Sequence, residues 1–506
     1  MSLEDRLTRR QMLAMTAGAG AASLLGRTPA ASAQPASATP RATDASRPNV
    51  LYVFADQWRR HALGCMPDAD PVQTPHMDAF ARQSLVLPNA IAGFPLCTPY
   101  RASLQTGLYP PGHGLTTNCS PNQKGLELGT EHRCIAEVFG DAGYHTAYFG
   151  KWHLCEPSVN RDPRPNDGAG GWDAFTPPGP RRQGWQHWFA YNAMDRHMRP
   201  HYWRDEPTPI EFDRWSPTVE TDELLRYLRD DRDADRPFLA MVSWNPPHPP
   251  FIAPREFMAR YPDDAAGLPR RANVTGRWPK RHDDPKYQRY SRVTSLDAAM
   301  HAYYAATTSI DHEFSRILAF LDEAGLADNT VVVITSDHGE MLGSHELMSK
   351  NQPYEESIGV PFVVRWPGRI APRFDPLLMN TPDVYPTLAG LAGLQAADSV
   401  EGLDHSDHWL GKRDTCPGVT LIQGPRSPQN PAAGWRGVRS QNDALWTWSP
   451  RHDNPESVRY SNLVNDPYQL ELANANIGPK PRVDELYTAM LDRLSATGDP
   501  AAQRLA

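Results

Sequence analysis

The 506-residue sequence contains no apolar run long enough to cross a lipid bilayer, which takes about 20 consecutive apolar residues. It also has no long run of lysine and arginine, and its formal net charge is −8. Proteins that bind nucleic acid by neutralising phosphates need a strongly basic surface. The sequence therefore argues against a multi-span membrane protein and against a nucleic-acid-binding protein, and we expect a small-molecule partner.

The residues that are present are typical of a folded globular protein with many ordered loops. Apolar residues make up 40% of the chain and charged residues 22%, and the mean hydropathy is −0.58. Proline is abundant, at 50 residues, and it fixes turns because its ring restricts the backbone. Functional residues are often carried on such loops. At about 100–200 residues per domain, the length suits roughly two domains.

The first residues have the pattern of an export signal. Arg9 and Arg10 are followed by an uncharged stretch, residues 11–26, and then by small residues. The stretch is too short to span a bilayer. We predict that residues 1–33 are a signal resembling the twin-arginine type, which exports folded proteins to the periplasm or beyond. Residues 34–47, rich in Ala, Ser, Thr and Pro, are predicted to be a spacer.

Four continuous apolar runs in the rest of the chain predict strands buried on both faces of a sheet. These runs are residues 49–54, 238–244, 330–336 and 360–364. Between the second and third runs, apolar side chains recur every three or four residues from Tyr303 to Leu321, which predicts a long amphipathic helix. A strand, a helix and another strand in this order favour a parallel sheet.

These patterns predict an α/β fold, in which residues 48–394 form a large mixed, mainly parallel sheet sandwiched by helices. Beyond residue 394 the pattern changes to shorter elements. We therefore predict that residues 395–506 form a smaller α+β subdomain with a short antiparallel sheet. The elements expected around and after this boundary are a helix at 383–391, strands at 419–423 and 444–448, and a closing helix at 483–494.

Polar side chains follow three of the predicted strands at the point where each strand ends. Asp56 and Gln57 follow the first, His248 lies shortly after the second, and Asp337 and His338 follow the third. Ligands of a parallel sheet gather outside the carboxyl ends of its strands, so we expect these side chains to converge. Each one alone is typical of an ordinary turn. Together, two carboxylates, an amide oxygen and an imidazole predict a divalent-cation site with mostly oxygen ligands.

The segment after the first strand carries the most specific motif, Cys97-Thr98-Pro99-Tyr100-Arg101 followed by Thr106-Gly107. The pattern C-x-P-x-R with a later T-G resembles the signature of the type I sulfatases, which belong to the alkaline phosphatase superfamily. The resemblance covers nearly all of the chain after the signal. It includes five further blocks in order, which are PNVLYVFADQ, GYHTAYFGKWHL, PPHPPF, TSDHGEMLGSHELMSK and VPFVVRWPG.

The resemblance implies that Cys97 is the precursor of the nucleophile. In this family a separate formylglycine-generating enzyme oxidises the cysteine to an aldehyde, which water hydrates to a geminal diol. One hydroxyl would attack sulfur, and loss of the proton from the second would expel sulfate. By the same resemblance, Asp56, Gln57, Asp337 and His338 hold a divalent metal beside residue 97.

The resemblance also gives roles to five basic residues. Arg101 would hold the diol, and Lys151 and Lys350 would bind the sulfate oxygens. His153 would accept the proton of the second hydroxyl and His248 would protonate the leaving alkoxide, although these two roles could be exchanged. With a divalent metal, the three cationic side chains and the two carboxylates leave the site with a net charge of +3. Such a site requires an anionic substrate.

Gln57 and His338 depart from the second aspartate and the asparagine that many arylsulfatases have at these places. The combination is similar to the branch with choline sulfatases and phosphonate monoester hydrolases. We expect Ca²⁺ because oxygen ligands dominate, with Mn²⁺ or Zn²⁺ as alternatives because imidazole softens the site. The predicted reaction is hydrolysis of a sulfate monoester by a sulfatase domain at residues 48–394. A phosphonate monoester hydrolase or phosphodiesterase with the same apparatus, and a catalytically silent protein that binds sulfated glycans, are the alternatives.

The substrate pocket is less clearly marked in the sequence. We expect Asn118, Arg59 and His61 to reach a substrate bound near the nucleophile, which makes them candidates for substrate contact. Residues 171–215 contain five tryptophans without clear periodicity, which predicts a loop insertion. Aromatic faces suit sugar rings, although these tryptophans could instead pack the loop onto the core. We expect a carbohydrate or another small organic sulfate ester as substrate, and the sequence does not indicate an oligomeric state.

Overall fold

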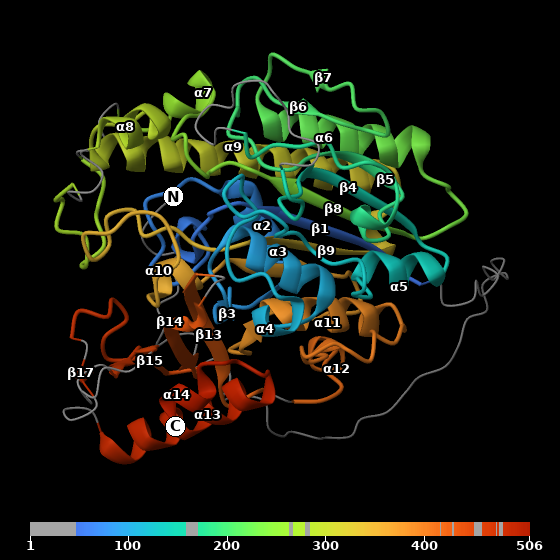
Figure 1. The fold of residues 1–506 in the computed structure, drawn as a ribbon. Coiled ribbons are helices and arrows are strands. Elements are labelled where there is room, and N and C mark those ends of the chain that lie inside the picture. The colour runs from blue at the N-terminus through green and yellow to red at the C-terminus, as the bar shows by residue number, and fades with distance from the viewer. Residues whose placement is uncertain are drawn as a thin grey trace, which may run out of the picture.

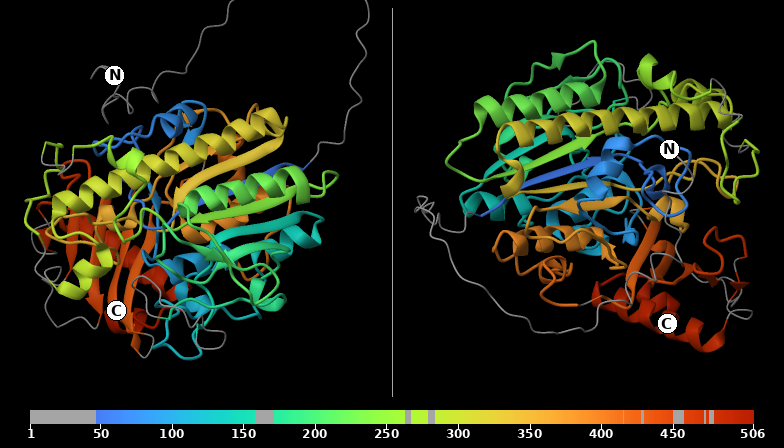
Figure 2. Two further views of the ribbon diagram at one scale, coloured as in Figure 1. Left: turned by 90° about the horizontal axis from the view of Figure 1, so that it is seen from above. Right: turned by 180° about the vertical axis from the view of Figure 1, so that it is seen from behind.

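The computed structural model describes residues 47–157, 171–262, 267–278, 284–414, 416–427, 430–449, 458–471, 473–474 and 479–506. The predicted signal at 1–33 and nearly all of the predicted spacer at 34–47 lie outside these residues. A mixed sheet runs through the main body with helices on both faces, and a second sheet with a long helix forms the C-terminal part (Figure 1, Figure 2).

The central sheet has the strand order β11-β2-β10-β9-β1-β8-β4-β5 among the described residues. Its strands are β1 (Asn49–Ala55), β2 (Leu85–Val86), β4 (His145–Lys151), β5 (His187–Tyr191), β8 (Phe238–Trp244), β9 (Thr330–Ser336), β10 (Phe362–Arg365) and β11 (Arg373–Phe374). β1 pairs in parallel with both β8 and β9, and every residue of these three strands is buried. Their continuous apolar runs follow from cover on both faces. The predicted α/β class with a mixed, mainly parallel sheet is confirmed.

Alternate side chains of β1 face two separate cores. Leu51 and Val53 belong to a core with one layer of helices, and Val50 and Tyr52 belong to a core with the other layer. α6 and α9 lie on one side of the sheet and α3, α5 and α11 on the other (Figure 1). The first layer consists of α2 (Pro75–Ala81), α6 (Ser216–Arg226) and α9 (Leu296–Glu323), and the second of α3 (Cys97–Thr106), α5 (Ile135–Asp141) and α11 (Val384–Leu391).

The helix predicted from Tyr303 to Leu321 is the central part of α9, whose apolar side chains face the sheet. The helix begins after Ser295, whose hydroxyl accepts a hydrogen bond from the amide of Ala298 at 3.2 Å. It ends before Gly325, which has a φ of +66°. α9 is therefore fixed at both ends by local sequence signals and along its length by packing.

The strand predicted at residues 360–364 is β10, which begins two residues later and runs antiparallel to β9. Val360 instead donates its backbone N–H to the carbonyl of Ala90 at 3.2 Å, and Pro361 has no N–H to donate. An apolar run marks a buried strand but carries no information about its direction. The mixed character of the sheet comes from β10 alone, which runs antiparallel to both of its neighbours, β9 and β2.

The prediction of a loop insertion over residues 171–215 is wrong in part. His187–Tyr191 forms β5, which extends the central sheet by pairing in parallel with β4. The strand is only five residues long and lies at the edge of the sheet, so its pattern is too short to stand out from the surrounding aromatic residues. The rest of this segment contains the two-stranded pair β6 (His201–Tyr202) and β7 (Ile210–Glu211).

The C-terminal part is built on an antiparallel sheet with the order β13-β14-β15-β16-β17. α13 packs against it, and their shared core includes Leu421, Val438, Leu445, Leu486 and Met490. The expected strands and closing helix correspond to β13, β15 and α13. The bounds of these elements are β13 (Thr420–Ser427), β14 (Asn430–Arg439), β15 (Asp443–Ser449), β16 (Arg459–Asn462), β17 (Ala473–Asn474) and α13 (Lys480–Ala496).

Shorter elements complete the described chain. They are β3 (Ala90–Ile91), which pairs with β12 (Met379–Asn380), and the helices α4 (Pro110–His113), α7 (Arg255–Met258), α8 (Pro285–Ser291), α10 (Glu355–Ile358), α12 (Ser406–Trp409) and α14 (Ala502–Leu505). None of the helices in the described ranges has both the length and the apolarity needed to cross a membrane.

Gly150 allows β4 to lie against β8 just before the strand ends at Lys151. Its φ is +92°, and it pairs with Ser243 of β8. A Cβ atom at this position would overlap the carbonyl oxygen of Ser243. Gly143, just before β4, has a similar φ of +90°, but a Cβ there would meet no atom within 4 Å. A comparison of the same substitution at the two positions therefore distinguishes the cost of the backbone conformation from the cost of steric overlap.

We expect Gly143→Ala to lower the free energy of unfolding by about 1–3 kcal/mol, the cost of the unfavourable backbone conformation alone. Gly150→Ala should cost about 1–3 kcal/mol more, because its Cβ also forces β4 and β8 apart. Urea unfolding of the two variants and the wild type measures the difference. Equal destabilisation of the two variants would contradict the role given to the contact with Ser243.

Candidate active site

Four neighbouring parallel strands end at the same edge of the central sheet, and polar residues lie at each of these ends. Asp56 follows β1, Asp337 follows β9, and Lys151 is the last residue of β4. Asn245 and His248 lie in the segment directly after β8. The convergence expected from parallel strands is therefore present at this edge.

Cys97, the first residue of α3, meets these strand ends. Its Sγ lies 3.3 Å from Nε2 of His338 and 3.6 Å from Oδ1 of Asp56. One ligand-type atom from each of Asp56, Cys97, Asp337 and His338 lies within 4.8 Å of the others, and all four residues are buried. The cluster is assembled from three separate segments of the chain, so it is a product of the fold and not of a local turn.

The hydrogen bonds of His338 decide which ring nitrogen faces the cluster. Nδ1 lies 3.0 Å from the carbonyl oxygen of Gly339, so Nδ1 carries the proton and donates. Burial, together with the charge of Lys350, holds the pKa of His338 well below its usual range. The neutral ring therefore presents the lone pair of Nε2 to Asp56 and Asp337, each 3.5 Å away. Metal-binding histidines are commonly oriented in this way.

The two carboxylates of the cluster do not hold their negative charge equally. Burial, together with the neighbouring Asp56, raises the pKa of Asp337 to about 7, although Arg101 and Lys151 oppose this rise. Burial opposes the ionisation of Asp56 as well, but the charges of Lys151 and Lys350 help to outweigh it, and the pKa of Asp56 lies well below its usual range. The cations of the protein thus leave Asp337 only partly ionised at neutral pH. A divalent cation would favour the ionised form of both carboxylates, so the residues present fit such an ion.

Arg101 is engaged with the carboxylates. One terminal nitrogen of its guanidinium donates to Oδ2 of Asp56 at 3.2 Å and to Oδ2 of Asp337 at 3.1 Å. The other donates to the carbonyl of Lys151 and to the hydroxyl of Ser243, both at 2.7 Å. The expected contact with the Cys97 side chain is not among these hydrogen bonds. Arg101 holds the strand ends together from behind the pocket instead of lining it.

Two lysines reach the cluster from different sides. Nζ of Lys151 donates to Oδ2 of Asp56 at 2.6 Å and to Oδ1 of Asn245 at 3.2 Å. Burial would lower the pKa of Lys151, but Asp56 more than offsets it, so the pKa is raised and the ammonium stays charged. Nζ of Lys350 donates to Oε1 of Gln57 at 2.5 Å. Each lysine therefore contacts one of the predicted metal ligands directly.

Gln57 is also held by a residue that the sequence analysis does not single out, Glu340. Nε2 of Gln57 donates to Oε2 of Glu340 in a close contact. Glu340 is fully buried and lies three residues after Asp337. Glu340 belongs to the block TSDHGEM and comes shortly after the candidate ligands Asp337 and His338. This position is the signal in the sequence that could have indicated a role for Glu340.

A pocket of about 250 Å³ opens beside the cluster. Four of the predicted site residues line it together with Asn118 from the predicted substrate set. Asp195 and Tyr290 also line it, and no pattern in the sequence indicated them. The full lining is Cys97, Asn118, Lys151, His153, Trp172, Ala193, Asp195, His248 and Tyr290.

His153 and His248 both line the pocket, and one ring nitrogen of each is bonded to a backbone carbonyl. Nε2 of His153 lies 3.2 Å from the carbonyl of Cys119, and its buried Nδ1 has no hydrogen-bond partner among the described residues. Nδ1 of His248 lies 2.7 Å from the carbonyl of Pro249 and 3.4 Å from Oδ1 of Asp195. Burial is the largest cause that lowers the pKa of both rings, followed by Lys151 for His153 and Lys350 for His248. Both are therefore neutral at pH 7.

Arg59 and His61 do not line the pocket, which corrects their assignment as substrate contacts. The Arg59 guanidinium is buried in an ion pair with Asp70 at 2.7 Å. Nε2 of His61 is buried between the guanidinium groups of Arg60 and Arg271, each at 3.3 Å. Closeness in sequence to Asp56 does not fix the direction of a side chain. Asn118 does line the pocket, and its Oδ1 accepts the Thr98 amide at 3.1 Å.

The tryptophans of residues 171–215 divide between the two roles left open by the sequence. Trp185, Trp188, Trp203 and Trp215 are buried, which agrees with packing of this segment onto the core. Trp172 lines the pocket, where its ring lies 5.8 Å from that of His153. One tryptophan is therefore placed to contact a substrate.

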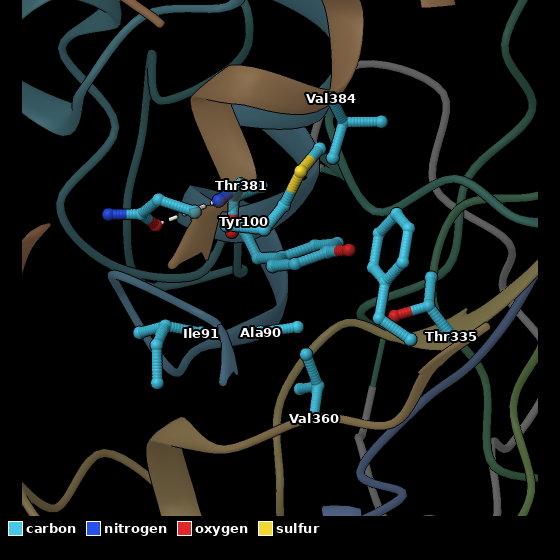
Figure 3. Close-up of a pocket in the computed structure, with 10 residues that line it drawn as sticks. Ala90, Ile91, Tyr100, Thr335, Val360, Thr381 and Val384 are labelled. Carbon is cyan, nitrogen blue, oxygen red and sulfur yellow. Dashed lines mark hydrogen bonds between the residues drawn. The ribbon is translucent and has the colours of Figure 1, made fainter. Parts of the chain in front are cut away.

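A second cavity, between β3, β10 and α11, is too small to be a substrate site. It measures about 10 Å³, which is about the space of one water molecule. Figure 3 shows Tyr100, Val360 and Val384 around it, and Thr335 and Thr381 at its rim. Of these two cavities, the pocket beside Cys97 combines a larger volume with reactive groups.

A mixed α/β sheet with a ligand cluster at its strand ends, and with Arg101, Lys151 and Lys350 around that cluster, defines an enzyme for an anionic substrate. The profile of the Sulfatase family matches residues 48–394, and the chain belongs to this family. It is a sulfatase, an enzyme that hydrolyses sulfate esters.

Known proteins resemble the chain over most of its length. An endo-4-O-sulfatase of Bacteroides thetaiotaomicron is 33% identical over 91% of this chain and 94% of its own. An ulvan-active sulfatase of Formosa agariphila is 33% identical over 91% of this chain and 83% of its own. A solved Bacteroides thetaiotaomicron structure, described under the metabolism of multiple glycosaminoglycans, superimposes with a TM-score of 0.81 at 32% identity, covering 91% of this chain and 99% of that one.

Substitution of one cluster carboxylate tests whether the cluster binds a cation. We expect Asp337→Asn to weaken the binding of Ca²⁺ to metal-stripped protein by at least about tenfold, since the site loses a charged ligand while the strands keep their packing. Isothermal titration measures the affinity, and circular dichroism checks the fold. Asp213→Asn, which removes an exposed carboxylate paired with Arg199, is the matched control and should bind like the wild type. Unchanged affinity in Asp337→Asn would exclude the cluster as the metal site.

Proposed function

We propose that this sulfatase hydrolyses a sulfate monoester of a carbohydrate with a nucleophile formed from Cys97. The observation that carries the proposal is the position of Cys97, which is buried beside three ligand-type side chains and lines the pocket together with Lys151. The endo-4-O-sulfatase and the ulvan-active sulfatase among the relatives support a carbohydrate substrate. Trp172 in the pocket lining supports it as well, because a flat aromatic face packs well against a sugar ring.

Cys97 is a weak nucleophile as an unmodified thiol. Burial, reinforced by Asp56, raises the pKa of the thiol to about 11, so little thiolate exists at neutral pH. We propose that a formylglycine-generating enzyme converts Cys97 to formylglycine, whose hydrate supplies one hydroxyl for attack on sulfur and a second whose deprotonation releases sulfate. The Sγ atom then marks the region of the attacking oxygen in the mature enzyme.

The proposed metal site consists of Asp56, Gln57, Asp337, His338 and residue 97. A divalent cation there would polarise a sulfate oxygen and stabilise negative charge as the ester bond breaks. Two carboxylates and an amide oxygen outnumber the single imidazole, which supports Ca²⁺, with Mn²⁺ or Zn²⁺ as alternatives.

Lys151 and Lys350 are proposed to bind the sulfate oxygens. An ammonium group has three donors, so Lys151 can keep its bonds to Asp56 and Asn245 and still donate to a substrate. Charge fixed in position before the substrate arrives stabilises the transition state without reorganisation. Arg101 supports this arrangement from behind, since it bonds both carboxylates.

His248 is proposed to protonate the leaving alkoxide. Its Nδ1 is occupied by Pro249 and faces Asp195, which leaves Nε2 to serve the pocket. The carboxylate of Asp195 would stabilise the protonated ring that this step requires. His153 is proposed to accept the proton of the second hydroxyl through Nδ1, because its Nε2 bonds Cys119. The exchange of these two roles is the alternative.

The remaining proposals concern cellular location and domain organisation. Arg9, Arg10 and the uncharged stretch that follows support export by the twin-arginine pathway, with residues 1–33 as the signal and 34–47 as the spacer. The enzyme would then act in the periplasm or outside the cell. Residues 48–394 are proposed as the catalytic domain and 395–506 as the C-terminal subdomain.

Turnover of a sulfate ester and of a phosphonate ester by one preparation tests the proposed function. A phosphonate monoester hydrolase or phosphodiesterase would use the same charges, and a silent glycan-binding protein would need the pocket alone. We expect hydrolysis of 4-nitrophenyl sulfate and of a sulfated monosaccharide, in proportion to the fraction of the Cys97 peptide whose mass shows conversion to the aldehyde. Cys97→Ala is the inactive control. A preference of more than about tenfold in kcat/KM for the phosphonate monoester would assign the alternative, and no turnover by fully converted protein would assign the binding role.

The role of His248 is tested by comparing leaving groups in one variant. We expect His248→Ala to slow an alkyl sulfate by about 10²–10⁴-fold, since a basic alkoxide needs a proton as it leaves. The same variant should slow 4-nitrophenyl sulfate much less, because a weakly basic phenolate leaves without help. Steady-state kcat values on both substrates give the comparison, and each serves as the control for the other. Equal losses would point to a role in sulfate binding instead.

A further inference from the structure

A glutamine can serve as a metal ligand only if its amide is turned the right way. The carboxamide has one oxygen, which can bind a cation, and one NH₂ group, which carries only donors and cannot. The two groups have the same shape, so packing does not distinguish them. The proposed role of Gln57 therefore requires a hydrogen-bond partner that fixes the orientation of its side chain.

Two charged side chains orient the Gln57 amide. Nε2 donates to Oε2 of Glu340, and Oε1 accepts from Nζ of Lys350 at 2.5 Å. A carboxylate has only acceptors and an ammonium has only donors, so both contacts require the same orientation. The oxygen of Gln57 lies on the side of Lys350, whose charge also acts on Asp56 and His338. We infer that the side of the amide that carries the oxygen is the side of the metal cluster, and that the NH₂ group, which is bonded to Glu340, is turned away from it.

Glu340 is itself rigidly held. Its Oε1 accepts two backbone N–H groups, from Leu342 at 2.9 Å and from Ser349 at 2.5 Å. The side chain is fully buried, so no water can replace these partners without rearrangement. Oε2 is therefore fixed toward Gln57. Lys350 is only partly buried and is proposed to bind sulfate, so Glu340 is the more permanent of the two constraints.

The backbone of Gln57 is fixed independently of its side chain. Its N–H donates to Oδ1 of Asp337 at 2.9 Å, and its carbonyl accepts the Tyr303 hydroxyl at 2.7 Å. Its φ of +67° is held in the left-handed region by these contacts. The remaining freedom of the residue is the rotation of its side chain, and Glu340 removes that freedom.

We propose that Glu340 is a positioning residue that turns the oxygen of Gln57, and not its nitrogen, toward the metal. The inference rests on the proposed metal site and adds to it a requirement outside the ligands themselves. Mutation of a residue that hydrogen-bonds to a metal ligand typically weakens metal binding by about 10–100-fold.

The exchange of Glu340 for glutamine gives the proposal a specific consequence. The oxygen of the introduced amide must still accept the Leu342 and Ser349 N–H groups, so its own NH₂ group would face Gln57. Gln57 would then turn its oxygen toward position 340 and its NH₂ group toward the metal. A second change, Gln57→Glu, supplies two oxygens, so one can accept from position 340 while the other faces the metal.

The experiment measures Ca²⁺ and Mn²⁺ binding by isothermal titration to metal-stripped, full-length protein in a double-mutant cycle. The four proteins are the wild type, Glu340→Gln, Gln57→Glu and the double variant, made in one host and with the state of Cys97 determined by peptide mass. We expect Glu340→Gln to weaken binding by at least about tenfold. In the Glu340→Gln background, Gln57→Glu should restore metal binding. In the protein with the native Glu340, Gln57→Glu places two carboxylates face to face, so it should raise the metal affinity far less.

The cycle separates orientation from simple charge. If Glu340→Gln acts only by removing a negative charge near the cation, Gln57→Glu will change the affinity by the same factor in both backgrounds. Additivity within about threefold, or unchanged affinity in Glu340→Gln, would falsify the proposal. Failure of both proteins that carry Glu340→Gln to fold would overturn it too, because Glu340 would then have a structural role that Gln57→Glu cannot relieve. Thermal melting of the metal-free proteins reports on folding.

Asp337→Asn, measured alongside, distinguishes the failure of this inference from the failure of the proposed site. If Asp337→Asn binds metal like the wild type, the cluster is not the metal site and the inference has no basis. If Asp337→Asn loses binding while the cycle is additive, the site stands and only the role of Glu340 is wrong.

Discussion

Two carboxylates buried side by side at the ends of adjacent strands are the constraint on which the site depends. Asp56 and Asp337 cannot move apart, because β1 and β9 pair in register up to the residues that precede them. Removing one partner from a buried ion pair costs about 3–5 kcal/mol, so the carboxylates need permanent counter-charges. Arg101 and Lys151 supply them. The guanidinium of Arg101 thereby stabilises the site by pairing with both carboxylates. Lys151 pairs with Asp56 and also lines the pocket.

The fold explains why this charge can be held without water. Helix layers cover both faces of the central strands, so the polar groups can gather only at the strand ends, where the pairing stops. α3 begins at this edge and presents Cys97 to the carboxylates with the partial positive charge of a helix N-terminus. Other residues of the pocket lining come from loops, which carry Trp172 and Asp195, and from α8, which carries Tyr290. The ligand cluster thus lies at the ends of regular elements, and the contacts available for substrate selection lie on loops and on α8.

The sequence predicts those parts of the site whose positions follow from strand polarity, and it fails where direction depends on packing. Asp56 and Asp337 could be placed together because parallel strands bring their ends to one edge. Arg59 follows Asp56 by three residues but turns into an ion pair with Asp70, which no local pattern indicates. Asp195 and Glu340 were missed because their partners, His248 and Gln57, are distant in the chain. The partners of a strand are also distant in the chain. The sequence therefore predicts that β10 is a strand but not its direction, and it does not predict the short edge strand β5.

The presence of glutamine at position 57 changes what the rest of the site must do. A carboxylate presents an oxygen whichever way it is turned, and it would bring a third negative charge to a cluster in which burial and Asp56 already raise the pKa of Asp337. An amide avoids that charge, but one of its two orientations is useless to a metal. The negative charge of Glu340 lies one residue further out, where two backbone N–H groups stabilise it. Glutamine at position 57 therefore keeps a third carboxylate out of the cluster, and it makes metal binding depend on a hydrogen bond of fixed direction.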